Sequence, residues 1–265
     1  MTMLSVDQLN QVYVDTYTGE ATVAIEDVSF DVPEGQFVSV IGPSGCGKTT
    51  VLNIVAGFVD ATGGTVRLQG SPVSGPGPDR GVVFQDFALF PWKTVEANIA
   101  FGLKTQGVGK VERRAKAQEM IDLVGLTGFE KKYPHELSGG MRQRAGVARV
   151  LATEPAIMLM DEPFASVDAQ TRRVLQQEVL RIWEQRRTTV LFVTHDVDEA
   201  VFMSDRVVVL SPRPSTVRAD LSIQIPRPRS WTDMHTNTEF VRIRRELMTM
   251  LGVETGVETG SRSAP

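Results

Sequence analysis

The feature that most constrains the fold of this chain is a glycine-rich loop, GPSGCGKTT, at residues 42–50. It satisfies the phosphate-loop pattern G-x-x-x-x-G-K-[ST] and stands between an apolar run at 37–41 and an amphipathic stretch that begins at Lys48. A short apolar run of this kind is typical of a buried parallel strand. A glycine turn that only joins a strand to a helix is the alternative. The complete motif in this strand–loop–helix context favours a phosphate site.

Each part of this loop has a chemical reason. The glycines let the backbone turn tightly, so that several N–H groups point at phosphate oxygens, and the following helix N-terminus adds partial positive charge. Lys48 would reach the β- and γ-phosphates, and the Thr49 hydroxyl would bind Mg²⁺. Cys46 is expected to be a small packing residue and not a redox centre. The loop residues predicted to bind the nucleotide are Gly42, Pro43, Ser44, Gly45, Cys46, Gly47, Lys48, Thr49 and Thr50.

Further buried strands are predicted for four apolar runs, at 81–84, 157–160, 189–193 and 207–210. Helical patterns alternate with the later runs. In one of them, four apolar residues fall on a single helix face, namely Leu175, Val179, Ile182 and Trp183. Because strands that alternate with helices favour parallel pairing, the chain is predicted to be an α/β domain with a largely parallel sheet.

The segment from about 87 to 155 has a different character. Apolar residues recur there at helical spacing among charged ones, at Ala117, Met120, Ile121 and Val124. No convincing strand pattern lies in this stretch, so we expect a helical subdomain inserted into the α/β domain. Beyond it we expect a Pro/Arg-rich extended segment at 211–230, a final helix within 236–252 and a flexible tail at 253–265.

The composition is that of an ordinary soluble chain. Its 265 residues carry a formal net charge of −4, which gives no electrostatic reason to expect nucleic acid as the principal partner. The single cysteine excludes an internal disulfide and suits a reducing compartment. No apolar run is long enough to span a bilayer, and the N-terminus lacks the pattern of a signal peptide. We therefore expect a cytosolic protein.

Polar residues follow the predicted strands. Asp161 and Glu162 come directly after the run at 157–160, at the edge where ligands gather in doubly wound sheets. The first carboxylate suits Mg²⁺ bound through water, and the second suits the orientation of an attacking water. Gln85 and His195 also follow strands; the amide could contact Mg²⁺ or the attacking water, and the imidazole could contact a γ-phosphate. Each of these residues alone is more typical of a solvated or structural polar group, and only the phosphate loop favours a catalytic role.

A second glycine motif, LSGGM at 137–141, stands at the beginning of another predicted helix. With it, the chain contains six motifs. Together these motifs have the order and spacing of an ABC-transporter ATPase subunit, which the chain resembles over about residues 3–215. The motifs are the phosphate loop, Gln85, LSGGM at 137–141, IMLMDE at 157–162, SVD at 166–168 and His195. The resemblance implies a P-loop NTPase fold over residues 3–235, with a largely parallel sheet core, an N-terminal antiparallel β part and the inserted helical subdomain.

The resemblance also answers why the chain has two glycine motifs. In that family the Ser-Gly-Gly turn binds the γ-phosphate of ATP held by the other subunit of a head-to-tail dimer. Backbone amides at a helix N-terminus do form an anion site. Ser138, Gly139 and Gly140 are therefore expected to bind the partner's nucleotide. Met141 stands where glutamine is usual, a difference that leaves the anion site in place.

The remaining site residues take their roles from the same resemblance. Glu162 is expected to be the catalytic carboxylate and His195 a γ-phosphate contact, with Lys48 on the phosphates. Gln85 is expected to sense the nucleotide and to face the membrane partner, and Asp168 to lie at the dimer seam. The expected magnesium ligands are Thr49, Gln85 and Asp161.

An aromatic side chain upstream of the phosphate loop is expected to stack on adenine. Tyr17 fits this position best, and Tyr13 is the rival because the insertion TYTGEAT blurs the register. The stretch DFALFPW, at 86–92, poses a second open question. Its aromatic residues beside Gln85 could form a groove that docks a cytoplasmic helix of the permease, or they could belong to the core of the helical subdomain.

Finer features resemble the ATPases of importers for nitrate, taurine and aliphatic sulfonates, among them THDVDEAVFMSDRVVVLS and the extra C-terminal helix. The resemblance implies ATP and Mg²⁺ as cofactors, and a dimer that ATP closes and hydrolysis reopens. The implied partners are a second copy of the chain, integral-membrane permease subunits and indirectly a solute-binding protein, without nucleic acid. The implied location is peripheral, on the cytoplasmic face of the inner membrane. The resemblance does not identify the transported solute.

Two other classes share part of this pattern. A soluble P-loop kinase would not need the Ser-Gly-Gly motif, Gln85 and His195 in this order. A non-transport ABC ATPase that acts in translation or DNA repair is the stronger alternative. Such proteins usually carry two cassettes or a long coiled coil, whereas this chain has one cassette and no heptad run.

Overall fold

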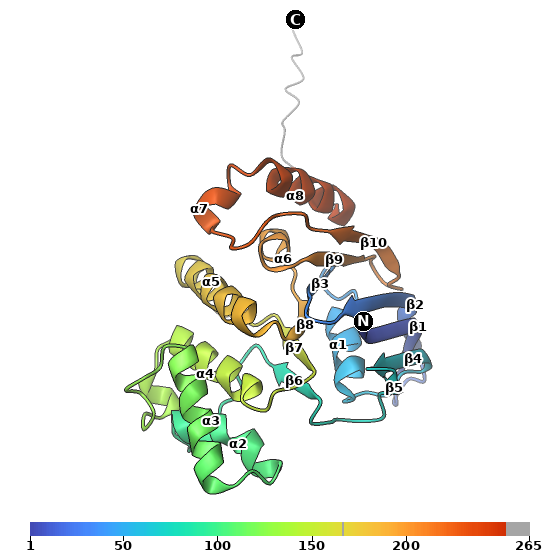
Figure 1. The fold of residues 1–265 in the computed structure, drawn as a ribbon. Helices are drawn as coiled ribbons and strands as arrows, with labels where there is room; N and C mark the ends of the chain where they lie inside the picture. The colour runs from blue at the N-terminus through green and yellow to red at the C-terminus, as the bar shows by residue number, and fades with distance from the viewer. Residues whose placement is uncertain (166, 253–265) are drawn as a thin grey trace, which may run out of the picture.

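The central element of the molecule is a six-stranded sheet in the order β10-β9-β3-β8-β7-β6 (Figure 1). The computed structural model describes residues 1–165 and 167–252. The strands are β3 (Phe37–Ile41), β6 (Arg80–Val83), β7 (Ile157–Asp161), β8 (Thr189–Val193), β9 (Arg206–Leu210) and β10 (Val217–Ser222). All neighbours pair in parallel except β10, which pairs antiparallel to β9 at one edge. The five predicted strands are confirmed, and the segment expected to be extended contains β10.

The central strands are mostly apolar because both faces of the sheet are covered. Phe37 and Ile41 of β3 belong to a core shared with helices on one face, whereas Val38 and Val40 belong to a core on the other face. Since successive side chains of a strand point to opposite faces, a strand between two cores has no solvent-facing position to fill with polar residues.

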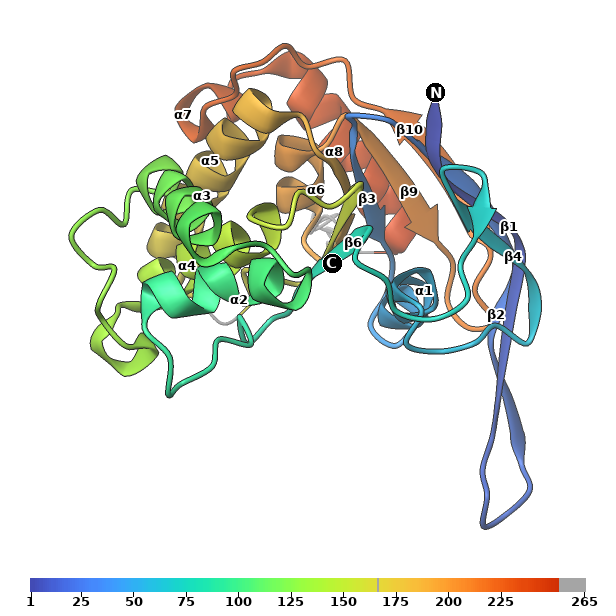
Figure 2. The same ribbon diagram turned by 60° about the horizontal axis from the view of Figure 1, so that its bottom comes forward.

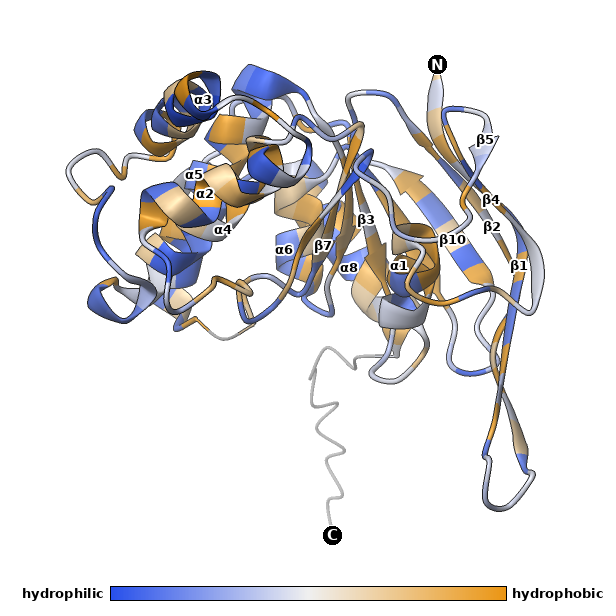
Figure 3. Ribbon diagram, turned by 90° about the horizontal axis from the view of Figure 1, so that it is seen from below, coloured by the Kyte–Doolittle hydropathy of each residue, from blue (hydrophilic) through white to orange (hydrophobic). Residues whose placement is uncertain are grey.

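A second, antiparallel sheet in the order β2-β1-β4-β5 packs beside the first. Its strands are β1 (Thr2–Val14), β2 (Ala21–Pro33), β4 (Gly63–Leu68) and β5 (Ser71–Pro72). Helix α1 (Lys48–Ala56) lies between the two sheets, and residues of all three form one apolar core (Figure 3). The long β1–β2 hairpin projects beyond the rest of the molecule (Figure 2). The expected N-terminal antiparallel part is therefore present.

The predicted helical subdomain is inserted between β6 and β7. It contains α2 (Val95–Thr105), α3 (Lys110–Leu123), a short 3₁₀ helix η1 (Pro134–Glu136) and α4 (Gly139–Leu151). Every residue from 87 to 155 is described, and none of them lies in a strand. The predicted apolar stripe of α3 is buried in a core that continues into the central sheet.

Four more helices complete the fold: α5 (Ala169–Arg186), α6 (Val197–Met203), α7 (Trp231–Met234) and α8 (Thr238–Leu251). The helix expected within 236–252 is α8, which packs on α6 and buries Phe240, Ile243 and Leu247. The tail expected at 253–265 lies outside the described residues. In the described part of the chain, no helix combines the length and apolar character needed to cross a bilayer.

Candidate nucleotide site

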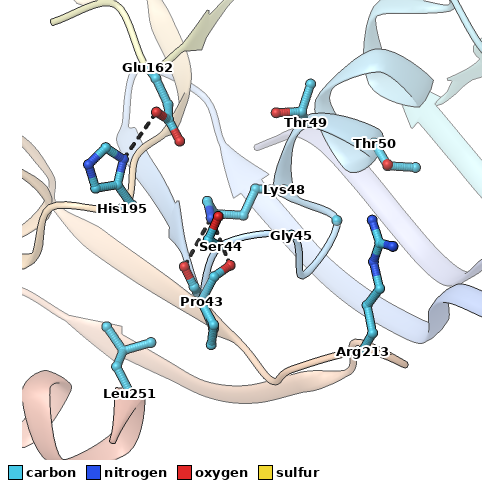
Figure 4. A pocket seen from close by; sticks show the side chains of 12 residues that line it. Pro43, Ser44, Gly45, Lys48, Thr49, Thr50, Glu162, His195, Arg213 and Leu251 are labelled. Carbon is cyan, nitrogen blue, oxygen red and sulfur yellow. Dashed lines mark hydrogen bonds and ion pairs between the residues drawn. The ribbon is translucent and has the colours of Figure 1, made fainter. Parts of the chain in front are cut away.

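The main candidate site is a pocket of about 700 Å³ where the phosphate loop meets the carboxyl ends of β7 and β8 (Figure 4). It brings together most of the residues predicted from the sequence and adds two that were not predicted, Arg213 and Leu251. Its lining residues are Gly42, Pro43, Ser44, Gly45, Gly47, Lys48, Thr49, Thr50, Glu162, His195, Arg213 and Leu251.

The phosphate loop positions its lysine through backbone geometry. Gly47 caps α1 with φ 105°, a left-handed conformation that favours glycine, and the helix begins at Lys48. The Lys48 ammonium is buried and donates hydrogen bonds to the carbonyl oxygens of Gly42 (2.9 Å) and Pro43 (3.1 Å). The loop therefore curls around a fixed positive charge beside a helix N-terminus, an arrangement that binds phosphate.

Cys46 does not line this pocket, in contrast to its neighbours in the loop. Its side chain is buried, and burial raises the pKa of the thiol. A buried thiol with a raised pKa is a weak nucleophile, which agrees with the expected packing role. The side chain points into the core between the sheets, so any contact of Cys46 with the nucleotide is left to its backbone.

Glu162 and His195 meet at the opposite end of the pocket. Glu162 follows β7, and its backbone N–H donates to the carbonyl oxygen of Val193 at the end of β8 (2.9 Å). Its φ of 44° lies in the left-handed region, which is unusual for a residue other than glycine and typical of functional positions. Glu162 Oε2 lies 3.0 Å from Nδ1 of His195. The two strand ends thus present a carboxylate and an imidazole as one unit.

A second carboxylate lies beside the phosphate loop. Asp161 Oδ1 accepts a hydrogen bond from the Thr49 hydroxyl at 3.2 Å, and burial raises the pKa of Asp161. Oxygen ligands from a hydroxyl and a carboxylate suit Mg²⁺, and a cation here would offset the desolvation that raises this pKa. These two residues therefore fit a magnesium site.

Gln85 is not brought into the pocket. Strand β6 ends at Val83, one residue before the end of the strand predicted at 81–84, and Gln85 lies exposed in the following loop. The structure thus places two of the three predicted magnesium ligands together and leaves Gln85 apart from them.

Of the two tyrosines, Tyr13 is the one beside the phosphate loop. Its hydroxyl donates to the Thr50 hydroxyl at 3.4 Å. Tyr17 is 99% exposed in the projecting β1–β2 turn and does not line the pocket. The pairing of β1 with β2 extends as far as Val14 and places Tyr17 in the turn beyond the sheet, so the geometry favours Tyr13 for the adenine contact.

The second glycine motif lines a different pocket, of about 630 Å³. Ser138 caps α4 by accepting a hydrogen bond from the Met141 N–H (3.3 Å), and Gly139 and Gly140 form the first turn. Asp168 lies in the same pocket and caps α5 through the Thr171 N–H (3.1 Å). Among the described residues, which omit Ser166 of the SVD motif, no side chain lines both pockets. The Ser-Gly-Gly turn therefore does not belong to its own chain's phosphate pocket.

A buried polar cluster behind His195 was missed from the sequence. Glu199 of α6 is 5% exposed and accepts hydrogen bonds from Gln176 Nε2 (2.6 Å) and the Thr194 hydroxyl. Burial raises the pKa of Glu199 to about 7, against the lowering effect of these hydrogen bonds. No sequence signal predicts the cluster, because its three members come from α5, α6 and the turn after β8.

The aromatic stretch after Gln85 divides between the two interpretations. Phe87 is 8% exposed and packs on Gly146 of α4, which confirms the core alternative for this residue. Phe90 packs against Phe101 with ring centroids 4.5 Å apart. Trp92, in contrast, is 71% exposed.

Known proteins share both the sequence and the fold. A family model described as ABC transporter matches residues 25–165. The taurine import ATP-binding protein TauB of Rhizobium johnstonii is 45% identical, over 94% of this chain and 96% of its own length. The nitrate import ATP-binding protein NrtD of a Synechocystis strain is 42% identical, over 94% of each. A solved dimeric ATP-binding cassette bound to ADP and phosphate superposes with a TM-score of 0.71 at 30% identity, covering 84% of this chain and all of that one.

The chain belongs to the ABC transporter family. It is an ATP-binding subunit of the import type, an ATPase whose hydrolysis of ATP is coupled to transport. The comparisons give no support to the alternative of an ABC ATPase that acts in translation or DNA repair.

Proposed function

We propose that this subunit energises the import of a small anionic or organic solute, of the nitrate, taurine or sulfonate kind, as a head-to-tail dimer. The observation that carries the proposal is the separation of two half-sites. One pocket holds the phosphate loop, Glu162 and His195, and the other holds the Ser-Gly-Gly turn. A nucleotide bound in the phosphate-loop pocket is enclosed only when a second copy of the chain supplies its Ser-Gly-Gly turn. The similarity to import ATP-binding proteins for taurine and nitrate supports the solute class.

Each residue of the pocket has a proposed part in hydrolysis. Lys48 and the loop N–H groups hold the β- and γ-phosphates. The Glu162 carboxylate orients the attacking water and takes up its proton. Because Glu162 already engages Nδ1 of His195, the other ring nitrogen is left for a γ-phosphate oxygen. Thr49 and Asp161 would hold Mg²⁺, which would neutralise charge on the phosphates.

The partners follow from the same proposal. A second copy supplies Ser138, Gly139 and Gly140, and Asp168 lies at the seam between the copies. Integral-membrane permease subunits bind the loop around Gln85 and hold the ATPase on the cytoplasmic face of the inner membrane. A solute-binding protein acts on the other side and does not touch this chain.

Two experiments test the arrangement. Glu162→Gln keeps the phosphate contacts and removes the charge that orients water, so this variant is expected to bind Mg-ATP, hydrolyse it very slowly and accumulate as a dimer in light scattering. The wild-type chain without nucleotide serves as the monomeric control. Hydrolysis by the variant near the wild-type rate would contradict the role of Glu162.

The second experiment mixes two inactive variants. Gly139→Asp places a carboxylate against the partner's γ-phosphate, whereas Lys48→Ala damages the chain's own phosphate loop. Each homodimer has two damaged sites, but the mixed dimer has one intact composite site and is expected to recover some hydrolysis. If coupled sites prevent turnover, one trapped nucleotide for each mixed dimer is expected. A mixture that traps none at saturating ATP contradicts the head-to-tail arrangement.

A further inference from the structure

The nucleotide pocket has a side wall that lies outside the region matched by the family model. The match ends at residue 165, whereas Arg213 and Leu251 come from the turn after β9 and from the end of α8. Arg213 is the only one of these two that carries a charge suited to a nucleotide. The guanidinium can act as a binding group if the turn that carries it is held in place against the pocket.

The turn from Ser211 to Thr216 is tied to the phosphate loop itself. Ser215 is fully buried, and its hydroxyl lies within hydrogen-bond distance of the carbonyl oxygens of Ala24 (2.9 Å) and of Cys46 in the loop, which share its one proton. The N–H of Ser211 donates to the carbonyl oxygen of Thr216 and closes the turn (3.0 Å). The Ser215 backbone adds two hydrogen bonds to β2, from its N–H to the Ala24 carbonyl oxygen (3.3 Å) and from the Glu26 N–H to its own carbonyl oxygen (2.9 Å). These contacts hold the turn in one position, because moving it would leave desolvated polar groups unpaired.

The guanidinium of Arg213 points from this turn into the pocket. Figure 4 shows it directed toward Gly45 and Thr50, on the opposite side of the phosphate loop from Glu162 and His195. Burial raises the pKa of the nearby Cys46 thiol, and the positive charges of Lys48 and Arg213 oppose that rise, which agrees with a guanidinium close to the loop. Among the described residues, no carboxylate lies within ion-pair distance of Arg213.

We propose that Arg213 is a nucleotide-binding residue that contacts the α-phosphate, at the end of the pocket remote from the bond that is cleaved. Thr50, with Tyr13 bonded to it, marks that end, and the Glu162–His195 pair marks the other. A guanidinium is well suited to phosphate oxygens and remains charged at all relevant pH values. This inference rests on the proposed nucleotide site and adds a second cation, beside Lys48, to it.

The test compares nucleotide affinities of Arg213→Ala and Arg213→Lys by calorimetry, with MgADP and a non-hydrolysable ATP analogue on the full chain. Because the α-phosphate is common to both ligands, Arg213→Ala is expected to weaken both by the same factor, about 3 to 10, the range of an exposed charge-assisted contact. Arg213→Lys is expected to restore part of the loss. Arg67→Ala, which removes an exposed arginine from β4, is the matched control and is expected to bind both ligands like wild type.

Two results would overturn the proposal: unchanged affinity of Arg213→Ala for both ligands, or a loss for the ATP analogue alone, which would place the guanidinium at the γ-phosphate. Since Arg213 is exposed, a change in folding is not expected, and an unchanged melting temperature confirms this. Lys48→Ala, measured in parallel, tests the phosphate-loop site independently of Arg213. If that variant binds nucleotide like wild type, the phosphate-loop site itself is wrong, whatever Arg213 does.

Discussion

The buried carboxyl of Glu199 predicts a stability difference that depends on pH. Glu199 accepts hydrogen bonds from Gln176 and Thr194, and burial raises its pKa from the ordinary value of 4.5 to about 7. Between these two values the native state keeps a proton that the unfolded state has lost. The free energy of unfolding therefore falls as the pH rises through this range, and the loss is complete above about pH 7. At about 1.4 kcal/mol for each pKa unit, the full cost of the buried charge is about 3 kcal/mol.

The substitution Glu199→Gln removes this cost without changing the volume of the side chain. Glutamine is neutral at every pH, and its amide can donate to Oε1 of Gln176, which has no hydrogen-bond partner among the described residues. Urea unfolding of both proteins at about pH 5 and about pH 8 measures the effect. We expect the stability of the variant relative to wild type to increase by about 2 kcal/mol between these two pH values.

A matched control is Glu112→Gln, which neutralises an exposed carboxylate on α3. Its difference from wild type is expected to stay within about 0.5 kcal/mol at both pH values. A raised pKa of Glu199 is refuted if the stability difference between Glu199→Gln and wild type is the same at both pH values, or if it grows toward acid. Either outcome would mean that the native carboxyl is already ionised near its ordinary pKa.

Three further substitutions test packing and docking. Trp92→Ala is expected to abolish copurification with the permease while the melting temperature stays within about 1 °C of wild type, because the side chain is 71% exposed; a fall in stability would instead indicate a core role. Gly57→Ala is expected to lower the unfolding free energy by about 2 kcal/mol or more in urea, since φ is 77° and a Cβ there would overlap the carbonyl of Gly75; a neutral effect would contradict the backbone geometry. Leu247→Ala in α8 is expected to cost about 2–3 kcal/mol in the same assay, and no loss would mean that α8 is not part of the folded core.

Most of the phosphate site could be predicted because its parts are local in the sequence. The loop, the carboxylates and His195 each stand within two residues of the end of an apolar run, and parallel strands bring their carboxyl ends to one edge of the sheet. The order of the motifs along the chain is therefore enough to predict that these residues lie together, without any detail of side-chain packing. Glu162 and His195 lie 3.0 Å apart although 33 positions separate them in the chain.

What could not be predicted depends on where elements end and on contacts between distant segments. Gln85 misses the pocket because β6 ends at Val83, and strand ends are fixed by pairing partners that a single sequence does not reveal. Tyr13 comes to the loop in place of Tyr17 because of the register of the β1–β2 pairing. Arg213 reaches the pocket only through Ser215, a hydroxyl whose partners lie in two other parts of the chain. No periodicity in the sequence encodes contacts of this kind.

The loop after β6, which carries the exposed Trp92, is fixed by hydrogen bonds to α2 and to α4, the helix that begins with the Ser-Gly-Gly turn. Asn98 of α2 is fully buried. Its Oδ1 accepts a hydrogen bond from the Phe90 N–H (2.8 Å), and its Nδ2 donates one to the Lys93 carbonyl oxygen (3.0 Å). The turn that carries Trp92 is therefore fixed to α2. Arg149 of α4 donates to the carbonyl oxygen of Ala88 (2.5 Å), which fixes the start of the same loop to the helix that begins with the Ser-Gly-Gly turn. A buried asparagine with several backbone partners resists local movement, because any displacement leaves desolvated groups unpaired. The residue proposed to contact the permease and the motif proposed to contact the partner's ATP therefore belong to one rigid unit, whereas the phosphate loop belongs to the sheet.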